Sequence, residues 1–512
     1  MVRGLEKFGP ENSGYRSGVR PTGLGPSGVN GITLNTKKAP NTEVKQDKAR
    51  DTYKKHRRNH GFGRSNTIPE LFTMASQRSI TELAALIEKN TKVLEQGTKG
   101  QPGGDFSLTF TLPPAAVKLD NSLEAVRTEI LEAADELKVR LLGPFAYIGA
   151  VAWPVPAIIV IFDCLYRFDI AGNVPATPGE SITYDALAQR IGMPVDDLRR
   201  VLQTAIAYRI FEEAEPEVSV RHNAVSAIFT LIPGIKDALS LLVEDNPNGA
   251  RRFVESVKRY PGSGEPGHSA LMVAERAMRG MSNDDIEDPS KGLFDIIADD
   301  PARLTRFRNT MGMGTRAPGY AVEYFLDSVP WDDAARCPKR IVDIGGAGGD
   351  LSKQILRRYP GVQSATSVDL PEVIATAETP AELEGRLSFK PYNFLTETMG
   401  YPADAYLFRH IFHDWSDQYA VKILKNLAAG LKEGTKVWIN EVVLPQLSDR
   451  NHLNDQRQRG ADLMMKVGFN GKERSRRGWE AVLAEADARF RIENIVKPEG
   501  ASDAVIEIVF GA

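Results

Sequence analysis

The sequence predicts an α/β protein in which a helical N-terminal part precedes a C-terminal domain built on a mostly parallel sheet. Before about residue 330, apolar residues recur at helical spacing. After residue 338, short apolar strands alternate with helical segments, and this alternation is typical of a parallel sheet covered on both faces. The length of 512 residues suits about two to four domains of ordinary size.

The composition excludes several classes of protein. The chain has two cysteines, Cys164 and Cys337, and no CxxC pair, so it lacks the residues for a zinc cluster or a disulfide framework. So few cysteines favour a reducing, cytoplasmic location. No apolar run typical of a secretory signal opens the chain. The net charge of −3 argues against nucleic-acid binding by the chain as a whole.

Residues 1–73 differ from the rest, because they carry 14 Lys and Arg against 6 Asp and Glu and few large apolar residues. Such a segment cannot offset the entropy lost on ordering, so we expect a disordered basic tail. The basic run at 54–58 could act as a nuclear address or contact nucleic acid, but a solvated tail is the better explanation. Met74 could equally be the true start of translation, since a helical segment follows it.

Residues 74–120 are expected to form an amphipathic helix and a linker, the linker running from Gly97 to Pro114. The apolar stripe of the helix consists of Ile80, Leu83, Ile87 and Leu94. A second helix is expected from Asn121, which we take as its N-cap.

The 22 residues 141–162 carry no charge and are long enough to span a membrane as a helix. Pro144, Pro154 and Pro156 would break that helix where no water could satisfy the freed carbonyls. We therefore expect no membrane span, and instead a buried core segment or a subunit interface.

Residues 183–221 show a helix, a turn at 192–194, a second helix and a short hairpin, which is the order of elements in a winged helix. The second helix offers arginines to DNA, but Asp196 and Asp197 occupy its start, where phosphates would approach. A helical and winged-helix dimerisation domain over 121–335 is therefore favoured over DNA binding.

Seven apolar strands are expected in the domain 336–512. Their ranges are Arg340–Ile344, Ser364–Asp369, Leu387–Tyr392, Ala405–Ile411, Lys436–Val443, Arg491–Val496 and Ala504–Phe510. Ligands of such sheets bind at the carboxyl ends of the strands, so the residues that follow each strand are the candidates for a site.

The first strand runs into a glycine-rich segment, 343–350, and then into a helix. Glycines allow a sharp turn and a close approach to a ligand, and the helix N-terminus offers free N–H groups. The pattern GxGxxG is not matched, which argues against a nicotinamide-dependent dehydrogenase. The second strand ends in Asp369, whose carboxylate can accept both hydroxyls of a ribose. Together these two features predict a nucleoside cofactor.

Two of the chain's seven histidines, His410 and His413, follow the fourth strand. Glu441 follows the fifth strand, and Glu473 precedes a later helix. A histidine whose tautomer is fixed by carboxylates can take a proton from a substrate hydroxyl, and we expect His413 to do so. His410 is expected to point elsewhere.

Five motifs stand in the order and at the spacing of one family. They are VDIGGAGGDLS (342–352), SVDLPEVI (367–374), FRHIFHDWSD (408–417), NEVVLP (440–445) and NGKERS (470–475). Through them, residues 120–512 resemble S-adenosylmethionine-dependent O-methyltransferases of the plant caffeate and, more closely, the fungal polyketide type. The resemblance implies a class I methyltransferase (Rossmann-like) domain whose last strand is antiparallel, and a homodimer formed through the N-terminal domain.

The resemblance also implies roles for single residues. His413 is the general base, and Glu441 and Glu473 bracket it. The cofactor S-adenosyl-L-methionine is held by Gly345, Gly346, Asp369, Leu370, Asn393, Phe394, Arg409 and Trp415. Candidate walls of the substrate pocket are Met311, Met313, Asp462, Met464, Met465 and Phe469, although methionine and aromatic residues at such spacing are as often plain core. No metal is implied.

Three features depart from the family pattern. Ala347 replaces a glycine or serine in the first loop, where one added methyl group should be tolerated. Asn393 stands where an acidic residue is common, which keeps a hydrogen bond but removes a charge near the adenine. The tail 1–73 has no family counterpart.

We therefore expect an enzyme that transfers a methyl group from S-adenosylmethionine to a phenolic hydroxyl of a secondary metabolite such as a polyketide. Its partners would be a small-molecule phenol and a second copy of the chain, with neither nucleic acid nor membrane. The alternative is a non-catalytic, cofactor-sensing regulator that binds DNA, but such a protein has no need of a base with two carboxylates around it. The sequence names neither the acceptor nor the position methylated.

Overall fold

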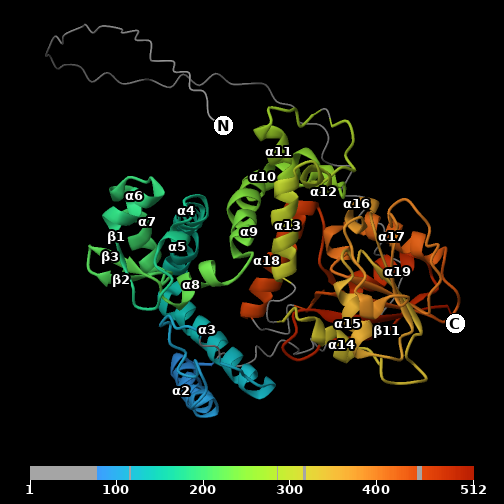
Figure 1. The fold of residues 1–512 in the computed structure, drawn as a ribbon, viewed down its shortest axis with the longest axis horizontal. Helices are drawn as coiled ribbons and strands as arrows, with labels where there is room; N and C mark the ends of the chain where they lie inside the picture. Colours follow the sequence, from blue (N-terminus) through green and yellow to red (C-terminus); the bar gives the residue numbers. More distant parts are fainter. Residues whose placement is uncertain (1–77, 115–116, 285, 315–318, 447–451, 512) are drawn as a thin grey trace, which may run out of the picture. The chain divides into compact units, whose positions relative to one another are not determined.

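The computed structural model describes residues 78–114, 117–284, 286–314, 319–446 and 452–511 (Figure 1). The expected basic tail, 1–73, and Met74 lie outside these residues.

The described chain opens with two helices that pack against each other, α2 (Ile80–Thr98) and α3 (Asn121–Ala152). Leu83 of α2 is fully buried, as the predicted stripe requires, whereas Ile80 in the first turn is half exposed. The N-cap of α3 is Asp120, whose carboxylate accepts a hydrogen bond from a backbone N–H of the first turn. The expectation that Asn121 caps this helix is therefore wrong, because the residue before it already does so.

Proline and glycine shape the uncharged segment, which ends α3 and continues in α4 (Pro154–Arg167). Gly143, just before Pro144, leaves the helical conformation with φ 69°. By length and composition alone, the helical stretch Asn121–Arg167 could cross a membrane. Only 6% of its most apolar window is buried, so the alternative of a buried core segment is wrong.

The elements predicted for residues 183–221 are present. They are α6 (Tyr184–Ile191), α7 (Val195–Ala207), β2 (Glu212–Glu215) and β3 (Ser219–Arg221), with β1 (Ile182–Thr183) paired to β3. Gly192 ends α6 in the left-handed conformation, with φ 70°. Arg199, which the sequence offers to DNA, lies over the ring of Tyr184.

A short helix, α5 (Ile170–Asn173), precedes this region, and a series of helices connects the region to the sheet. They are α8 (Ala224–Leu231), α9 (Ile235–Ser240), η1 (Leu241–Asp245), α10 (Asn246–Arg259), η2 (Pro266–His268), α11 (Ala270–Met278), α12 (Leu293–Ala298), α13 (Pro301–Gly314) and α14 (Val322–Ser328). A late helix, α18 (His452–Phe469), packs against α10 and α11 (Figure 1). Helices from both halves of the sequence therefore meet beside one edge of the sheet.

The sheet has seven strands in the order β11-β12-β8-β7-β4-β5-β6. Their bounds are β4 (Arg340–Ile344), β5 (Ser364–Asp369), β6 (Leu387–Pro391), β7 (Ala405–Arg409), β8 (Thr435–Glu441), β11 (Phe490–Val496) and β12 (Ala504–Phe510). The five from β4 to β8 run parallel, and β12 is antiparallel between β8 and β11. This arrangement confirms the predicted class I methyltransferase fold.

Alternate residues of the central strands face two apolar layers. Tyr406 and Phe408 of β7 join a cluster with α17 (Asp417–Ala428) and α19 (Arg476–Ala486). Leu407, between them, joins a cluster on the other face with α14 and α15 (Asp350–Arg358). Each large apolar side chain removed from water contributes about 1.5–3 kcal/mol, so these two layers hold the sheet rigid beneath the loops at its edge.

The loops at the carboxyl edge of the sheet contain short elements. These are α16 (Pro371–Ile374), η4 (Phe412–Asp414), β9 (Val443–Leu444) and β10 (Arg474–Ser475), whereas η3 (Ala381–Leu383) precedes the amino end of β6. The strand β7 ends two residues earlier than predicted, because His410 adopts a positive φ of 53° that ends the extended backbone.

Candidate active site

The glycine loop after β4 is tightly packed against β5. The backbone N–H groups of Gly345 and Gly346 both point to the carbonyl oxygen of Val368, at 2.8 and 3.3 Å. A Cβ atom on Gly346 would lie 2.3 Å from Oγ of Ser367 and 2.7 Å from Oδ2 of Asp343, so no larger residue fits. The start of α15 follows this loop, and its free N–H groups suit a negatively charged or polar ligand.

Asp369 at the end of β5 lies against the same loop. Its Oδ2 accepts a hydrogen bond from the backbone N–H of Ala347 at 3.0 Å, and its Oδ1 accepts one from Leu370 at 2.8 Å. Burial raises the pKa of Asp369, and the charge of Arg308 on α13 opposes this change. The structure thus brings together the two sequence features that predict a nucleoside site.

The residues expected beside the adenine follow β6. Oδ1 of Asn393 accepts a hydrogen bond from the N–H of Leu395 and so closes a local turn. Phe394 meets Trp415 edge to face, with ring centroids 5.9 Å apart. Two predicted cofactor residues from separate strands are therefore in contact.

Trp415 also belongs to an aromatic cluster with Phe469, a candidate pocket wall, and with Phe294, which the sequence analysis missed. Phe294 of α12 lies 6.4 Å from Trp415 and 5.3 Å from Phe469 of α18, measured between ring centroids. This cluster joins the helical part of the chain to the expected cofactor site. Phe294 belongs to no motif and is far from the other two in the sequence, so no local pattern connects it to the site.

Arg409 is mostly engaged within the protein. Its Nε donates to Oδ1 of Asn440 at 2.9 Å, and a terminal nitrogen donates to the carbonyl oxygen of Tyr320 at 2.5 Å. Its expected contact with the cofactor beside Trp415 stays a prediction.

His413 lies among three carboxyl groups. Its Nδ1 is 3.1 Å from Oε1 of Glu473 and 3.7 Å from Oε2 of Glu441, and its Nε2 is 3.8 Å from Oδ1 of Asp414. Burial alone would lower the pKa of His413, but the charges of Glu441, Asp414 and Glu473 outweigh burial and raise it well above its ordinary value. The cluster predicted from three separate motifs is therefore assembled, with Asp414 as an additional member.

The two glutamates are fixed by different contacts. Oε1 of Glu441 accepts hydrogen bonds from the backbone N–H groups of Ile411 and Phe412, each at 2.7 Å. The backbone N–H of Glu473 donates to Oδ1 of Asp462 at 2.9 Å. Both glutamates are buried, and burial raises the pKa of Glu473. Asp462, expected in the substrate pocket, thus holds the segment that carries Glu473.

Arg474 holds the histidine turn in place, a role that the sequence analysis missed. Its fully buried guanidinium donates to the carbonyl oxygens of Phe412 at 2.8 Å and Trp415 at 2.7 Å. The charge is balanced by Asp417, 3.0 Å from Nε. The turn that carries His413 is therefore held from two sides, by Glu441 and by Arg474.

Gly471 allows the segments that carry His413 and Glu473 to approach each other. A Cβ atom there would lie 2.2 Å from the carbonyl oxygen of His413. The next residue, Lys472, donates its N–H to that same oxygen at 2.8 Å. Glycine at this position lets the segment of Glu473 lie directly on the turn of His413.

His410 does not point elsewhere as expected. Its ring stacks on that of His413, with centroids 5.7 Å apart and an interplanar angle of 22°. The positive φ of His410 and the tight turn of η4 break the alternation of a strand, so the two rings lie on the same side.

The structure shows few contacts for the methionines that are expected to line the substrate pocket. Met465 of α18 is half-buried, and its carbonyl oxygen accepts the N–H of Gly471 at 3.1 Å. Met311 and Met313 lie on α13, one turn beyond Arg308, and Met311 is 43% exposed. The pocket role of these methionines stays a prediction.

His413, Glu441 and Glu473 could also hold a metal ion, because one ligand atom from each lies within 4.8 Å of the others. Both glutamates already bind the protein, Glu441 through Oε1 and Glu473 through the ring of His413. Activity measured after removal of metal ions can decide whether these residues bind a metal ion or accept a proton.

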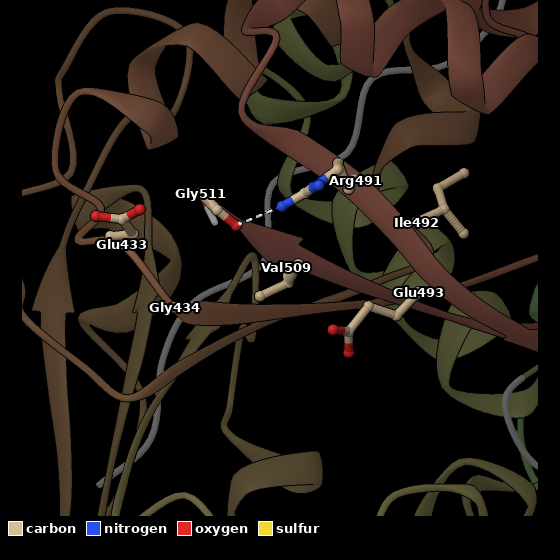
Figure 2. A pocket seen from close by; sticks show the side chains of 7 residues that line it. All are labelled: Glu433, Gly434, Arg491, Ile492, Glu493, Val509 and Gly511. Atoms are coloured by element: carbon tan, nitrogen blue, oxygen red, sulfur yellow. Dashed lines mark hydrogen bonds between the residues drawn. The ribbon is translucent and has the colours of Figure 1, made fainter.

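A separate cavity lies at the opposite edge of the sheet. Figure 2 shows it, with a volume of about 490 Å³ and with Glu433, Arg491 and Gly511 among its lining residues. Glu433 precedes β8 and Gly511 follows β12, so this cavity is at the amino end of β8 and does not adjoin the histidine cluster.

Comparisons with known proteins agree with this geometry. Residues 292–489 match a family described as the O-methyltransferase domain. The chain is 31% identical over 437 residues to O-methyltransferase kk1A of Curvularia clavata, covering 84% of this chain and 97% of that protein. It is 30% identical over 445 residues to the grayanic acid biosynthesis cluster O-methyltransferase of Cladonia grayi, covering 84% and 88%. A solved structure of OxaC in complex with SAH and oxaline has a TM-score of 0.64 at 17% identity, covering 84% and 100%.

Proposed function

This chain belongs to the O-methyltransferase family, and we propose that it transfers a methyl group from S-adenosylmethionine to a phenolic hydroxyl of a secondary metabolite, with His413 as general base. The observation that carries this proposal is the position of His413 between buried carboxylates at the edge of the sheet where the glycine loop also lies. The biosynthetic cluster named for the relative from Cladonia grayi supports a secondary metabolite such as a polyketide as the acceptor.

The residues at the glycine loop fit S-adenosylmethionine. Gly345 and Gly346 leave no room for a side chain, so their backbone can lie close to the methionine part. Asp369 can accept the ribose hydroxyls, and Leu370, Asn393 and Phe394 would border the adenosine. When bound, S-adenosylmethionine supplies a methyl group that its sulfonium already activates.

His413 can accept the proton of the acceptor hydroxyl. Glu473 binds Nδ1, which places the ring proton there and leaves the lone pair of Nε2 for the substrate. A phenol has a pKa of about 10. Because the pKa of His413 is raised, the difference between the two pKa values is smaller, and this favours proton transfer as the new C–O bond forms.

The carboxylates stabilise the product of that proton transfer. Once Nε2 holds the phenolic proton, the imidazolium is flanked by Glu473, Glu441 and Asp414. Because these groups are already in position, little reorganisation is needed during the reaction. The neighbouring residues also hold the ring in line for a close approach of the acceptor oxygen and exclude water.

We further propose that the N-terminal domain, 121–335, forms a homodimer and that 336–512 is the catalytic domain. The uncharged segment exposes large apolar side chains, with Phe145 95%, Trp153 88% and Ile148 67% exposed. Such a contiguous apolar patch is costly in water, and a second copy of the chain would cover it. Two free cysteines support a cytoplasmic location.

The test of the activity is mass spectrometry of reactions with methyl-labelled S-adenosylmethionine and a panel of phenols, including anthraquinone-like and xanthone-like rings. We expect one acceptor or more to gain one labelled methyl group. Transfer to none of them, while simple amines or thiols are methylated, would contradict the proposal.

The homodimer is tested by analytical ultracentrifugation of the wild type and of Phe145→Glu with Trp153→Glu. We expect a dimer for the wild type and a monomer for the variant. A monomeric wild type that floats with lipid vesicles would instead show that the apolar segment binds membranes.

A further inference from the structure

A second imidazole lies beside the proposed base, and the mechanism does not use it. His410 has a φ of 53°, a conformation that costs a residue with a Cβ atom roughly 1–2 kcal/mol. Two contacts hold it there: its N–H donates to the carbonyl oxygen of Asn440 at 3.2 Å, and its Nε2 lies 2.6 Å from Oδ2 of Asp503. Backbone strain of this kind concentrates at functional sites.

The side chain of His410 extends away from the expected cofactor site. Asp503 directly precedes β12, and β12 lies beyond β8 in the sheet order. The glycine loop and Asp369 follow β4 and β5, on the other side of β7. His410 therefore faces the half of the sheet edge that the cofactor leaves to the acceptor.

The two imidazoles lie side by side, and both are partly exposed. Their rings are stacked, and 21% of the His410 side chain and 22% of the His413 side chain are exposed. A molecule that reaches Nε2 of His413 is thus within reach of His410.

The carboxylates hold the two rings in opposite tautomers. Asp503 binds Nε2 of His410, so the ring proton lies on Nε2 and the lone pair lies on Nδ1. Among the described residues, Nδ1 of His410 has no hydrogen-bond partner. Asp503 itself is buried, and Tyr320 packs edge-on against the His410 ring at 6.0 Å. The free nitrogen of His410 is therefore a positioned hydrogen-bond acceptor.

We propose that His410, oriented by Asp503, binds a second hydroxyl of the acceptor, beside the hydroxyl that is methylated. This inference rests on the proposed function. The substrate class is then a polyhydroxylated aromatic compound in which the two hydroxyls are on neighbouring or alternate carbons. A ring that carries a methoxy group in place of the second hydroxyl has no proton to donate to Nδ1 and leaves that nitrogen unpaired.

The first test compares three forms of one aromatic ring system, with one hydroxyl, with two hydroxyls, and with one hydroxyl and one methoxy group. For the wild type, we expect kcat/KM to be at least about tenfold higher for the dihydroxy form than for either other form. His410→Asn should reduce this ratio about tenfold, mainly through KM, and asparagine tolerates the positive φ. Equal losses on all three acceptors would mean a structural role and overturn the proposal.

The second test uses Asp503→Asn. An amide in place of the carboxylate can donate to Nε2, which moves the ring proton to Nδ1 and turns an acceptor into a donor. In this variant we expect kcat/KM to become higher for the acceptor with one hydroxyl and one methoxy group than for the dihydroxy acceptor. Asp487→Asn, a control at a surface ion pair with Arg489, should keep the wild-type preference.

Isothermal titration calorimetry keeps this test independent of turnover. The affinity for S-adenosylmethionine should be the same in the wild type and in His410→Asn, and the affinity for the dihydroxy acceptor should fall about tenfold. A loss of S-adenosylmethionine affinity would make His410 a cofactor residue and overturn the inference. Tight binding of the dihydroxy ring without methyl transfer would contradict the proposed function alone.

Discussion

Oε1 of Glu473 lies 3.1 Å from Nδ1 of His413, although 59 residues separate the two in the sequence. This contact exists because Gly471 lets the segment after α18 lie on the turn after β7. Because Glu473 binds Nδ1, the contact leaves Nε2 of His413 free to accept a proton.

His413→Gln should abolish turnover and keep the cofactor affinity. A glutamine cannot accept the phenolic proton, so we expect kcat to fall about 100-fold or more. Because His413 is not among the residues expected to hold the cofactor, the affinity for S-adenosylmethionine should change less than about threefold in calorimetry. A variant with wild-type kcat would remove His413 from the mechanism.

The rate should rise with pH. Only neutral His413 can accept a proton, and its pKa is raised by the neighbouring carboxylates, so kcat/KM should increase through a midpoint above pH 6.5. Glu473→Gln removes one of the charges that raise this pKa, and the midpoint should move to lower pH. Glu480→Gln, at an exposed ion pair with Arg476, is the matched control and should leave the midpoint in place. If the midpoint of the pH profile were the same in Glu473→Gln as in the wild type, the role given to this carboxylate would be contradicted.

Removal of metal ions should leave the activity intact. The charge that His413 needs is supplied by carboxylates, so dialysis against EDTA should change kcat less than about twofold. An activity that is lost and then returns with Mg²⁺ or Zn²⁺ would show that His413, Glu441 and Glu473 bind a metal ion instead.

Gly471→Ala should damage both stability and activity. The new methyl group would lie 2.2 Å from the carbonyl oxygen of His413, so one of the two segments must move. We expect a loss of about 1–3 kcal/mol in the free energy of unfolding and a large fall in kcat. Gly460→Ala, on an exposed position of α18 where no atom lies within 4 Å, should raise the free energy of unfolding by about 0.5–1 kcal/mol. Urea denaturation measures both, and wild-type kcat in Gly471→Ala would contradict the close approach.

Ala347→Gly should be neutral or stabilising. Ala347 has a φ of 45°, where a Cβ atom costs roughly 1–2 kcal/mol, and the flexibility of glycine costs about 0.5–1 kcal/mol. The free energy of unfolding should therefore rise by between about 0 and 1.5 kcal/mol. Ala375→Gly, at an ordinary φ of −57°, should lower it by about 0.5–1 kcal/mol. If Ala347→Gly lowered the free energy of unfolding as Ala375→Gly does, the loop would not be strained at Ala347.

The sequence predicts the sheet and the motifs at its edge well, because four of the five motifs stand at the end of an apolar strand. Glycines, Asp369 and His413 all stand within a few residues of a strand end, and parallel strands bring such positions together. Asp503 and Phe294 could not be predicted in the same way, because they reach the site from distant segments that carry no motif. Arg474 stands in the motif NGKERS, but its hydrogen bonds to the turn of His413 depend on packing that no local pattern records.

The errors also have local causes. His410 was expected to follow strand alternation, but its left-handed backbone conformation ends the strand and turns the ring toward His413. The uncharged segment 141–162 was expected to be covered, as its composition demands, yet a single chain leaves it largely exposed. Composition shows that a surface needs a partner but does not show whether that partner belongs to the same chain.

The position of β12 between β8 and β11 also bears on how the protein is made. During synthesis, β8 has no neighbour on its outer side until residues 504–510 have emerged from the ribosome, and Asp503 arrives with them. From the synthesis of β8 until β12 is made, the nascent chain thus carries an open strand edge, which invites association with other nascent chains. Cells that express the protein with residues 504–510 deleted should accumulate it in inclusion bodies, however complete its cofactor loop is.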